Sequence, residues 1–210
     1  MKYIIAILVL GFIACNDPVT FNSPQPTNAA DENSFPEKLM GNYLSEDKYS
    51  ILTIDSNSIV NTYDYDEKEH KDSLDTSYVL KGDTIFSKNS DSKEKVVIKG
   101  DTLLKHVHFT DTLFTITDSS LLRYFKGYYF LNIKSKTNSW VVQKLSLQKG
   151  KLTIGHVSDS ADLHKLQEIT GTVEDTITIP FSLTRRQFKK FLRNEGFSNK
   201  EVFTKITLSK

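Results

Sequence analysis

The sequence has little of several residue types, and each shortage excludes a class of protein. It contains one cysteine in 210 residues, so no intramolecular disulfide framework can hold it. It has no apolar run of about 18 residues or more, which argues against a chain embedded in a membrane through helices. Basic residues are not in excess either. The 27 Lys and Arg stand against 26 Asp and Glu, and this balance argues against a nucleic-acid binder held by global positive charge.

Apolar residues are scarce as well. They make up 38% of the chain, which is below the roughly 45–50% of ordinary soluble domains. The composition is nevertheless not that of a disordered protein, since aromatic residues reach 11%. We therefore expect a folded protein with a small hydrophobic core.

The N-terminus has the pattern of a secretory signal peptide. Lys2 precedes an apolar run over residues 3–13, and the small residue Ala14 follows it. About eleven apolar residues are too few for a transmembrane helix. We therefore predict that residues 1–14 are a signal peptide that takes no part in the fold.

The sole cysteine, Cys15, directly follows this segment. The tetrapeptide Phe12-Ile13-Ala14-Cys15 resembles the lipobox of bacterial lipoproteins, with Phe12 where that family usually has a smaller aliphatic residue. The resemblance implies cleavage before Cys15, a diacylated thiol and a new amine that can carry a further chain such as palmitate. Several acyl chains, at roughly 0.8 kcal/mol per buried methylene, anchor a protein stably. The alternative is a plain signal peptide followed by an incidental thiol.

The expected location is therefore the cell envelope, on a bacterial membrane and on the outer one in preference to the inner. Residues 15–36 are predicted to form a lipidated, proline-rich tether, because they contain four of the five prolines of the chain. As a flexible coil, about twenty residues reach roughly 25 Å. We expect this tether to hold the folded part near the membrane without pressing it onto the surface.

The rest of the chain, residues 37–210, is expected to form one β-rich domain. The alternative is two β units, over residues 37–118 and 119–210. Short runs rich in β-branched and aromatic residues alternate with polar turns about every eight to twelve residues, and Lys-Gly-Asp-Thr occurs twice as a candidate hairpin turn. Strands are predicted over residues 49–54, 77–80, 84–87, 95–99, 102–109, 112–117, 128–134, 140–147, 151–155, 176–181 and 201–208.

One helix interrupts this pattern near the C-terminus. Thr184 and Gln187 have the spacing of a capping box, and Gly196 is suitably placed to end the helix. Its apolar face carries Phe188 and Phe191. Its other face is basic, with Arg185 at the border, and comprises Arg185, Arg186, Lys189, Lys190 and Arg193. A second short helix is predicted around residues 161–167.

The expected fold class is mainly β. An antiparallel meander forms a barrel-like or sandwich domain, and the amphipathic helix is followed by a last strand. The segment Leu39-Met40-Gly41-Asn42-Tyr43 resembles a relaxed form of the Gly-x-Trp phrase that opens lipocalins, with Tyr43 in the place of Trp. This resemblance implies a barrel of antiparallel strands.

Charge is balanced only in total. Residues 16–80 contain 13 acids and 4 bases, whereas residues 183–210 contain 8 bases and 2 acids. The acids are densest over residues 64–72, which we predict to be an exposed loop between strands. The basic helix face is a candidate for contact with an anionic surface such as membrane headgroups, and the alternative is that it only faces water.

The sequence contains none of the common catalytic motifs. Gly-x-Ser-x-Gly, His-Glu-x-x-His, the P-loop and Gly-x-Gly-x-x-Gly are all absent. His106 and His108 share a strand face at a spacing that suits the start of a metal site, with Asp111 or His156 as a third ligand. An exposed polar strand face explains the pair more simply, so we expect no metal and no cofactor.

These observations favour a non-enzymatic envelope lipoprotein with a binding or interaction role. Besides the membrane, the expected partner is a small apolar or glycan ligand or another envelope protein, and nucleic acid is not expected. One group of aromatic residues belongs either to a ligand site or to the core, namely Tyr124, Phe125, Tyr128, Tyr129, Phe130 and Trp140. The alternative function is a carboxylate-dependent hydrolase of the cell envelope.

Overall fold

The computed structural model describes residues 19–157, 160–172 and 180–207. Antiparallel strands dominate it, which confirms the predicted mainly β fold. The helices are α1 (Ser160–Thr170) and α2 (Arg185–Arg193), and a 3-10 turn covers Lys71–Ser73. The strands are β1 (Thr20–Phe21), β2 (Asp31–Glu32), β3 (Gly41–Ser45), β4 (Ser50–Ile54), β5 (Ser58–His70), β6 (Tyr78–Lys81), β7 (Thr84–Ser87), β8 (Lys93–Lys95), β9 (Val97–Lys99), β10 (Thr102–Thr115), β11 (Ser120–Phe125), β12 (Tyr128–Lys134), β13 (Trp140–Gln148), β14 (Lys151–His156) and β15 (Asn199–Ile206).

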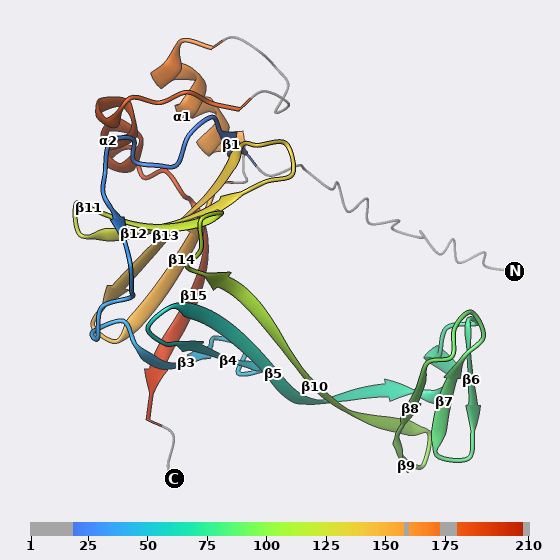
Figure 1. Cartoon of the computed structure of the whole chain (residues 1–210). Helices are drawn as coiled ribbons and strands as arrows, with labels where there is room; N and C mark the ends of the chain where they lie inside the picture. Colours follow the sequence, from blue (N-terminus) through green and yellow to red (C-terminus); the bar gives the residue numbers. More distant parts are fainter. Residues whose placement is uncertain (1–18, 158–159, 173–179, 208–210) are drawn as a thin grey trace, which may run out of the picture.

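The large sheet is an open, curled layer (Figure 1). Its strand order is β2-β11-β12-β13-β14-β15-β3-β4-β5-β10-β9, and β1 pairs with β13 beside this path. The last strand, β15, lies between β14 and β3 and thereby joins the later strands of the chain to the earlier ones. The sheet is not closed into a barrel, so the sandwich-like form is the one found. The lipocalin resemblance itself stays a prediction.

Two hydrophobic clusters hold the layers together. One lies between the two halves of the curled sheet and includes Tyr43 on β3 and Phe203 on β15. The hydroxyl of the buried Tyr43 donates a hydrogen bond to the carbonyl oxygen of Leu39 at 2.7 Å, which satisfies its one polar group. The other cluster lies on the outer face, where the helices cover β12 and β13, and it includes Phe130 and Phe188.

The ends of α2 follow from its local sequence. The Thr184 hydroxyl accepts a hydrogen bond from the Gln187 backbone N–H at 3.3 Å, and Gln187 Oε1 accepts one from the Thr184 N–H at 2.9 Å. The predicted capping box is therefore confirmed. At the other end, Glu195 takes the left-handed conformation, with φ of 56°. The following residue is Gly196, and a Cβ atom at this position would collide with the ring of Phe191.

Two other predicted elements have different outcomes. The short helix predicted around residues 161–167 is present as α1. The strand predicted over residues 176–181 lies outside the described residues except for Pro180 and Phe181, and Phe181 forms a parallel bridge with Phe21.

The N-terminal segment packs on the domain, so the tether prediction is wrong for residues 19–36. β1 pairs with β13 and β2 pairs with β11. The side chains of Phe21 and Phe35 are 0% and 1% exposed, and Asn132 Nδ2 donates a hydrogen bond to the Gln25 carbonyl oxygen at 2.9 Å. Composition misled here, because buried aromatic side chains, backbone pairing with β11 and β13 and hydrogen bonds such as that of Asn132 together hold a polar, proline-rich segment on the sheet.

The acidic stretch is also not the predicted loop. Residues 64–70 belong to strand β5, which pairs with β10 along its length. Bases on β10 compensate the acids across the ladder. Lys105 Nζ lies 2.8 Å from Glu69 Oε2, and His106 Nδ1 lies 3.1 Å from Asp66 Oδ1. β10 is likewise one strand with a bulge, where two strands were predicted.

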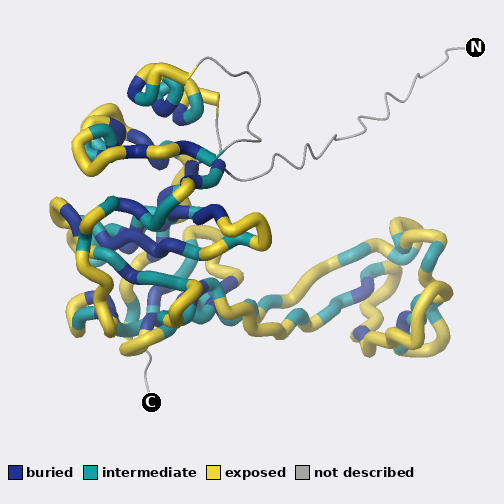
Figure 2. Tube along the Cα trace, turned by 45° about the horizontal axis from the view of Figure 1, so that its top comes forward, coloured by how far each residue is buried: buried dark blue, intermediate teal, exposed yellow. Residues whose placement is uncertain are grey.

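Beyond Tyr63, which is paired with Ser50 of β4, the strands β5 and β10 leave the sandwich as a two-stranded ribbon. We call residues 64–108 the arm. At its far end the arm carries a three-stranded sheet, β6-β7-β8, with a small hydrophobic cluster of its own around Ile85 and Val96. Figure 2 shows that much of the arm is exposed, and Figure 1 places the helices at the opposite end of the molecule.

Candidate functional site

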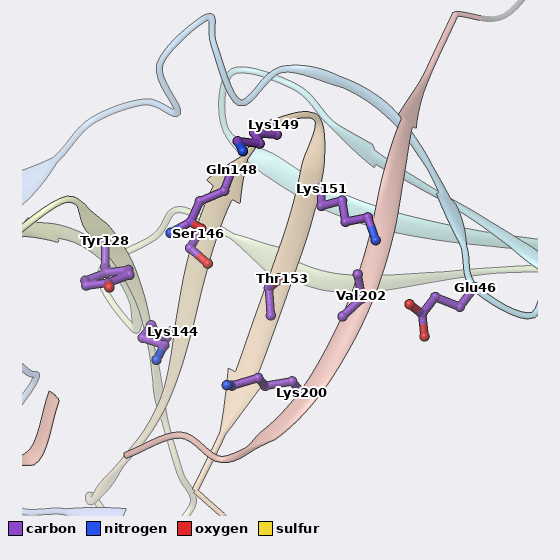
Figure 3. Close-up of a pocket in the computed structure, with 10 residues that line it drawn as sticks. All are labelled: Glu46, Tyr128, Lys144, Ser146, Gln148, Lys149, Lys151, Thr153, Lys200 and Val202. Atoms are coloured by element: carbon purple, nitrogen blue, oxygen red, sulfur yellow. The ribbon is translucent and has the colours of Figure 1, made fainter. Parts of the chain in front are cut away.

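A groove of about 620 Å³ lies on the outer face of β13, β14 and β15 (Figure 3). The alternation of side chains along β13 explains its position. Val142 is buried in the cluster under the helices, whereas Lys144, Ser146 and Gln148 point to the same side of the sheet beyond the helices. The other strands and turns add Lys149, Lys151, Thr153, Lys200 and Val202, and the lining is completed by Tyr128 and Glu46.

Four lysines surround this groove, namely Lys144, Lys149, Lys151 and Lys200. Within the described part of the chain, the lysine ion pairs involve Lys105 and Lys165 and none of these four. Glu46 is the one acidic residue among the described residues that line the groove. The groove therefore has an excess of positive charge.

Lys144 is the most enclosed of the four. Its Nζ donates a hydrogen bond to the Gly196 carbonyl oxygen at 3.2 Å and lies 5.3 and 5.5 Å from the ring centroids of Tyr128 and Phe197. Burial lowers the pKa of Lys144, and the charge of Lys200 lowers it further. An anion bound beside both ammonium groups would favour their charged forms and so oppose this shift.

A smaller cleft of about 270 Å³ adjoins the groove and shares Glu46, Lys200 and Val202 with it. It forms because β3 pairs with β15 only from Phe203 onward, which leaves residues 199–202 of β15 at an open edge of the sheet. Asn61 borders this cleft and is 4% exposed, and its Oδ1 has no hydrogen-bond partner among the described residues. The cleft thus continues the groove past β15, and its lining adds polar side chains such as Asn61.

Carboxylates at the cleft do not have the properties of a general acid. The hydroxyl of Ser45 donates to Asp47 Oδ1 at 2.5 Å, and this hydrogen bond lowers the pKa of Asp47. His156 Nε2 lies 3.0 Å from Glu201 Oε1, and this contact lowers the pKa of Glu201. A general acid at neutral pH needs a raised pKa. Nothing at this cleft favours the hydrolase alternative, which stays a prediction.

The predicted histidine pair lies on the arm. His106 and His108 share one face of β10, where His106 Nδ1 lies 3.1 Å from Asp66 Oδ1 and His108 Nδ1 lies 3.4 Å from Asp64 Oδ2. Neither suggested third ligand joins them, because Asp111 alternates to the other face of β10 and His156 belongs to β14. The described residues contain no group of His, Cys, Asp and Glu that could hold a metal ion.

Most of the predicted aromatic group belongs to the core. Phe125, Tyr129, Phe130 and Trp140 are at most 9% exposed. Tyr124 is exposed, and Tyr128 is the member of the group that lines the groove.

The predicted basic residues of α2 lie at the surface. Arg185, Arg186, Lys190 and Arg193 are exposed and Lys189 is partly exposed. The guanidinium of Arg185 lies 4.9 Å from the ring centroid of Phe125. Cys15 lies outside the described residues.

Comparisons with family models, with curated proteins and with solved structures give no match. No helix among the described residues is both long and apolar enough to span a membrane. The site is therefore interpreted from its own chemistry.

Sequence reasoning missed the groove. The signal available was the alternation of Lys144, Ser146 and Gln148 at positions that could be predicted to share a strand face. Lys200 could not be joined to them from the sequence, because it comes from a different strand.

Proposed function

We propose that this protein is a lipid-anchored, non-enzymatic binding protein of the bacterial cell envelope, and that its groove on β13, β14 and β15 holds an anionic ligand. The observation that carries the proposal is the set of lysines 144, 149, 151 and 200, which form no ion pair with a described residue. Lysines without an acidic partner attract carboxylate, sulfate or phosphate groups, and they do so more strongly where burial lowers the effective dielectric.

The rest of the lining favours a polar ligand over an apolar one. Ser146, Gln148 and Thr153 offer uncharged donors and acceptors between the lysines. A volume of about 620 Å³ lies in the range of about 300–1,000 Å³ that small-ligand sites occupy. The interior of the sandwich is filled by side chains such as Tyr43 and Leu52, both 0% exposed. An anionic glycan or another small organic anion therefore suits the groove better than a lipid.

The location is proposed on the N-terminus. Cleavage after Ala14 and acylation of Cys15 would attach the protein to a bacterial membrane, the outer one in preference to the inner. No catalytic residue is assigned.

Calorimetric titration of the full mature chain, made lipid-free by Cys15→Ala, tests the ligand class. The probes are oligogalacturonate, a uronic-acid oligomer, and its methyl ester, which keeps the sugar and removes the charge. We expect the acid to bind about tenfold or more tightly than the ester, because only the acid can pair with the lysines.

Variants locate the binding. Lys144→Gln combined with Lys200→Gln should weaken oligogalacturonate binding about tenfold or more. The matched control, Lys93→Gln combined with Lys95→Gln, removes the same charge from exposed residues of the arm and should leave the affinity unchanged. Equal affinities for the two double variants, or for the acid and its ester, would refute the proposal.

A further inference from the structure

Basic side chains cover one side of the short helix α2. The buried side holds Phe188 and Phe191 against the sheet, so the charged side faces outward. None of the bases forms an ion pair with another described residue. They are Arg185, Arg186, Lys189, Lys190 and Arg193, and the helix contains no acid.

The neighbouring helix α1 does not neutralise this charge. Its acids are Asp162 and Glu168, and Asp162 Oδ1 is paired with Lys165 Nζ at 3.0 Å. Among the described residues, neither Glu168 of α1 nor Glu195 shortly after α2 forms an ion pair with the bases of α2.

Little chain separates the domain from the proposed lipid anchor. Val19, the first described residue, comes four residues after Cys15, and four residues span at most about 14 Å. From Thr20 onward the chain is fixed, because β1 pairs with β13. A link this short keeps the domain against the surface that holds the lipid.

The same pairing brings β1, at the start of the described chain, next to the segment that leads into α2. The Phe181 N–H donates to the Thr20 carbonyl oxygen at 2.8 Å, and the Asn22 N–H donates to the Phe181 carbonyl oxygen at 3.0 Å. Asn22 Nδ2 also donates a hydrogen bond to Ser182 Oγ at 2.6 Å. The helix α2 begins three residues after Ser182. Figure 1 shows β1, α1 and α2 together at one end of the molecule. Because α2 begins four residues after Phe181, its start lies within about 14 Å of the place where β1 meets Phe181, and the helix is about 13 Å long.

We infer that α2 lies against an anionic phospholipid surface, with its five bases among the headgroups. Two independent features select a membrane as the occupant of this helix face. The face is positively charged, as attraction to an anionic leaflet requires, and the chain next to it leads within four residues to the lipidated cysteine. The inference rests on the proposed acylation of Cys15, and it is independent of what the groove binds.

This contact determines how the molecule stands on the membrane. β13 meets β1 at Trp140 and Val141, and the groove residues 144–148 follow four to eight residues after Trp140. At about 3.3 Å per residue, they lie roughly 13–27 Å farther along the strand. The groove therefore lies beyond the helices on the same outer face of the sheet, and the arm extends from the end of the sandwich opposite to the helices (Figures 1 and 2).

Contact is measured by fluorescence quenching on the lipidated full mature protein. A dye is attached to Asn194→Cys, directly after α2, or to Ser90→Cys in the arm, and the vesicles contain a quencher on their headgroups. One vesicle type is phosphatidylethanolamine and phosphatidylglycerol in equal parts, and the other is phosphatidylcholine. We expect the dye near α2 to be quenched, about fivefold or more strongly with phosphatidylglycerol, and the dye on the arm to be unaffected.

Charge variants separate attraction from mere proximity. Changing Arg185, Arg186, Lys189 and Lys190 to Gln should abolish the preference for phosphatidylglycerol. The matched control removes four exposed charges from the end of the arm and should keep the preference, as should Lys144→Gln combined with Lys200→Gln in the groove. The control set is Lys81, Lys93, Lys95 and Lys99.

Three results would overturn the inference. They are equal quenching near α2 in both vesicle types, equal quenching in the α2 variant and the control, and quenching of the dye on the arm. The Cys15→Ala protein tests the anchor separately. It should detach from phosphatidylcholine vesicles, and firm binding there would disprove the acylation on which the inference rests.

Discussion

The substitution Phe21→Ala tests whether the N-terminal segment is part of the fold. Phe21 is 0% exposed and belongs to the cluster beneath the helices. A buried phenylalanine covers about 150–250 Å², which at about 25 cal/mol per Å² corresponds to about 4–6 kcal/mol as an upper bound. Core Phe→Ala changes cost about 3–5 kcal/mol. We therefore expect the free energy of unfolding to fall by about 4 kcal/mol, a large part of the roughly 5–15 kcal/mol of an ordinary domain.

Urea unfolding of the full mature chain measures this loss. The only tryptophan, Trp140, pairs with Phe21 across β1 and β13, so its fluorescence reports on the site itself, and far-UV circular dichroism reports on the sheet. The control Phe109→Ala removes the same atoms from a side chain that is 49% exposed and stacks on Tyr63 at 4.4 Å. It should cost about 1.5 kcal/mol or less. A loss below about 1 kcal/mol for Phe21→Ala would mean that the segment is a loose tether after all.

Two further predictions concern the C-terminal part of the chain. Gly196→Ala should lower the free energy of unfolding by about 1–3 kcal/mol, because the new Cβ displaces the ring of Phe191, and an unchanged thermal midpoint would contradict this packing. The pKa of Glu201 is lowered from 4.5 by its contact with His156, so its carboxylate stabilises the fold above pH 4.5 and this contribution is lost as the pH falls through the lower folded pKa. Glu201→Gln should therefore lose less stability than the natural protein between pH 5 and pH 3 in urea unfolding, and parallel losses would refute the role of the pair.

The binding groove and the membrane-facing helix are proposed on the same outer face of the sheet. The helices cover one part of this face, where Val142 of β13 is buried beneath them. The four lysines of the groove lie on the part of the face that the helices leave open. A ligand would therefore have to reach the groove along the part of this face that lies beyond the helices.

Local sequence patterns predicted much of the secondary structure. The predicted ranges 84–87 and 128–134 coincide with β7 and β12, and the capping box marked the start of α2. β11 was missed because Ser-Leu-Leu-Arg-Tyr-Phe contains no β-branched residue. No part of β5 was predicted as a strand, and in its acidic part the charges that stabilise the strand, such as Lys105, come from β10.

The candidate site was less predictable than the strands. Because successive side chains of a strand point to opposite faces, the sequence predicts that Lys144, Ser146 and Gln148 share a face of one strand. It does not predict that Lys200, on the last strand, lies across the same groove. Charge clusters assembled from distant segments leave no local signal in a single sequence.

The sequence by itself determined the antiparallel β character of the protein and the start of α2, because these depend on residues close together in the chain. It also supplied the signal and lipobox patterns on which the anchor proposal rests. The tertiary structure alone decided that β15 enters between β14 and β3 and that the segment from Val19 to Pro36 packs on the sandwich. The physical reason is that backbone hydrogen bonds are alike for every strand, so the choice of distant partners depends on how all the side chains fill the core together.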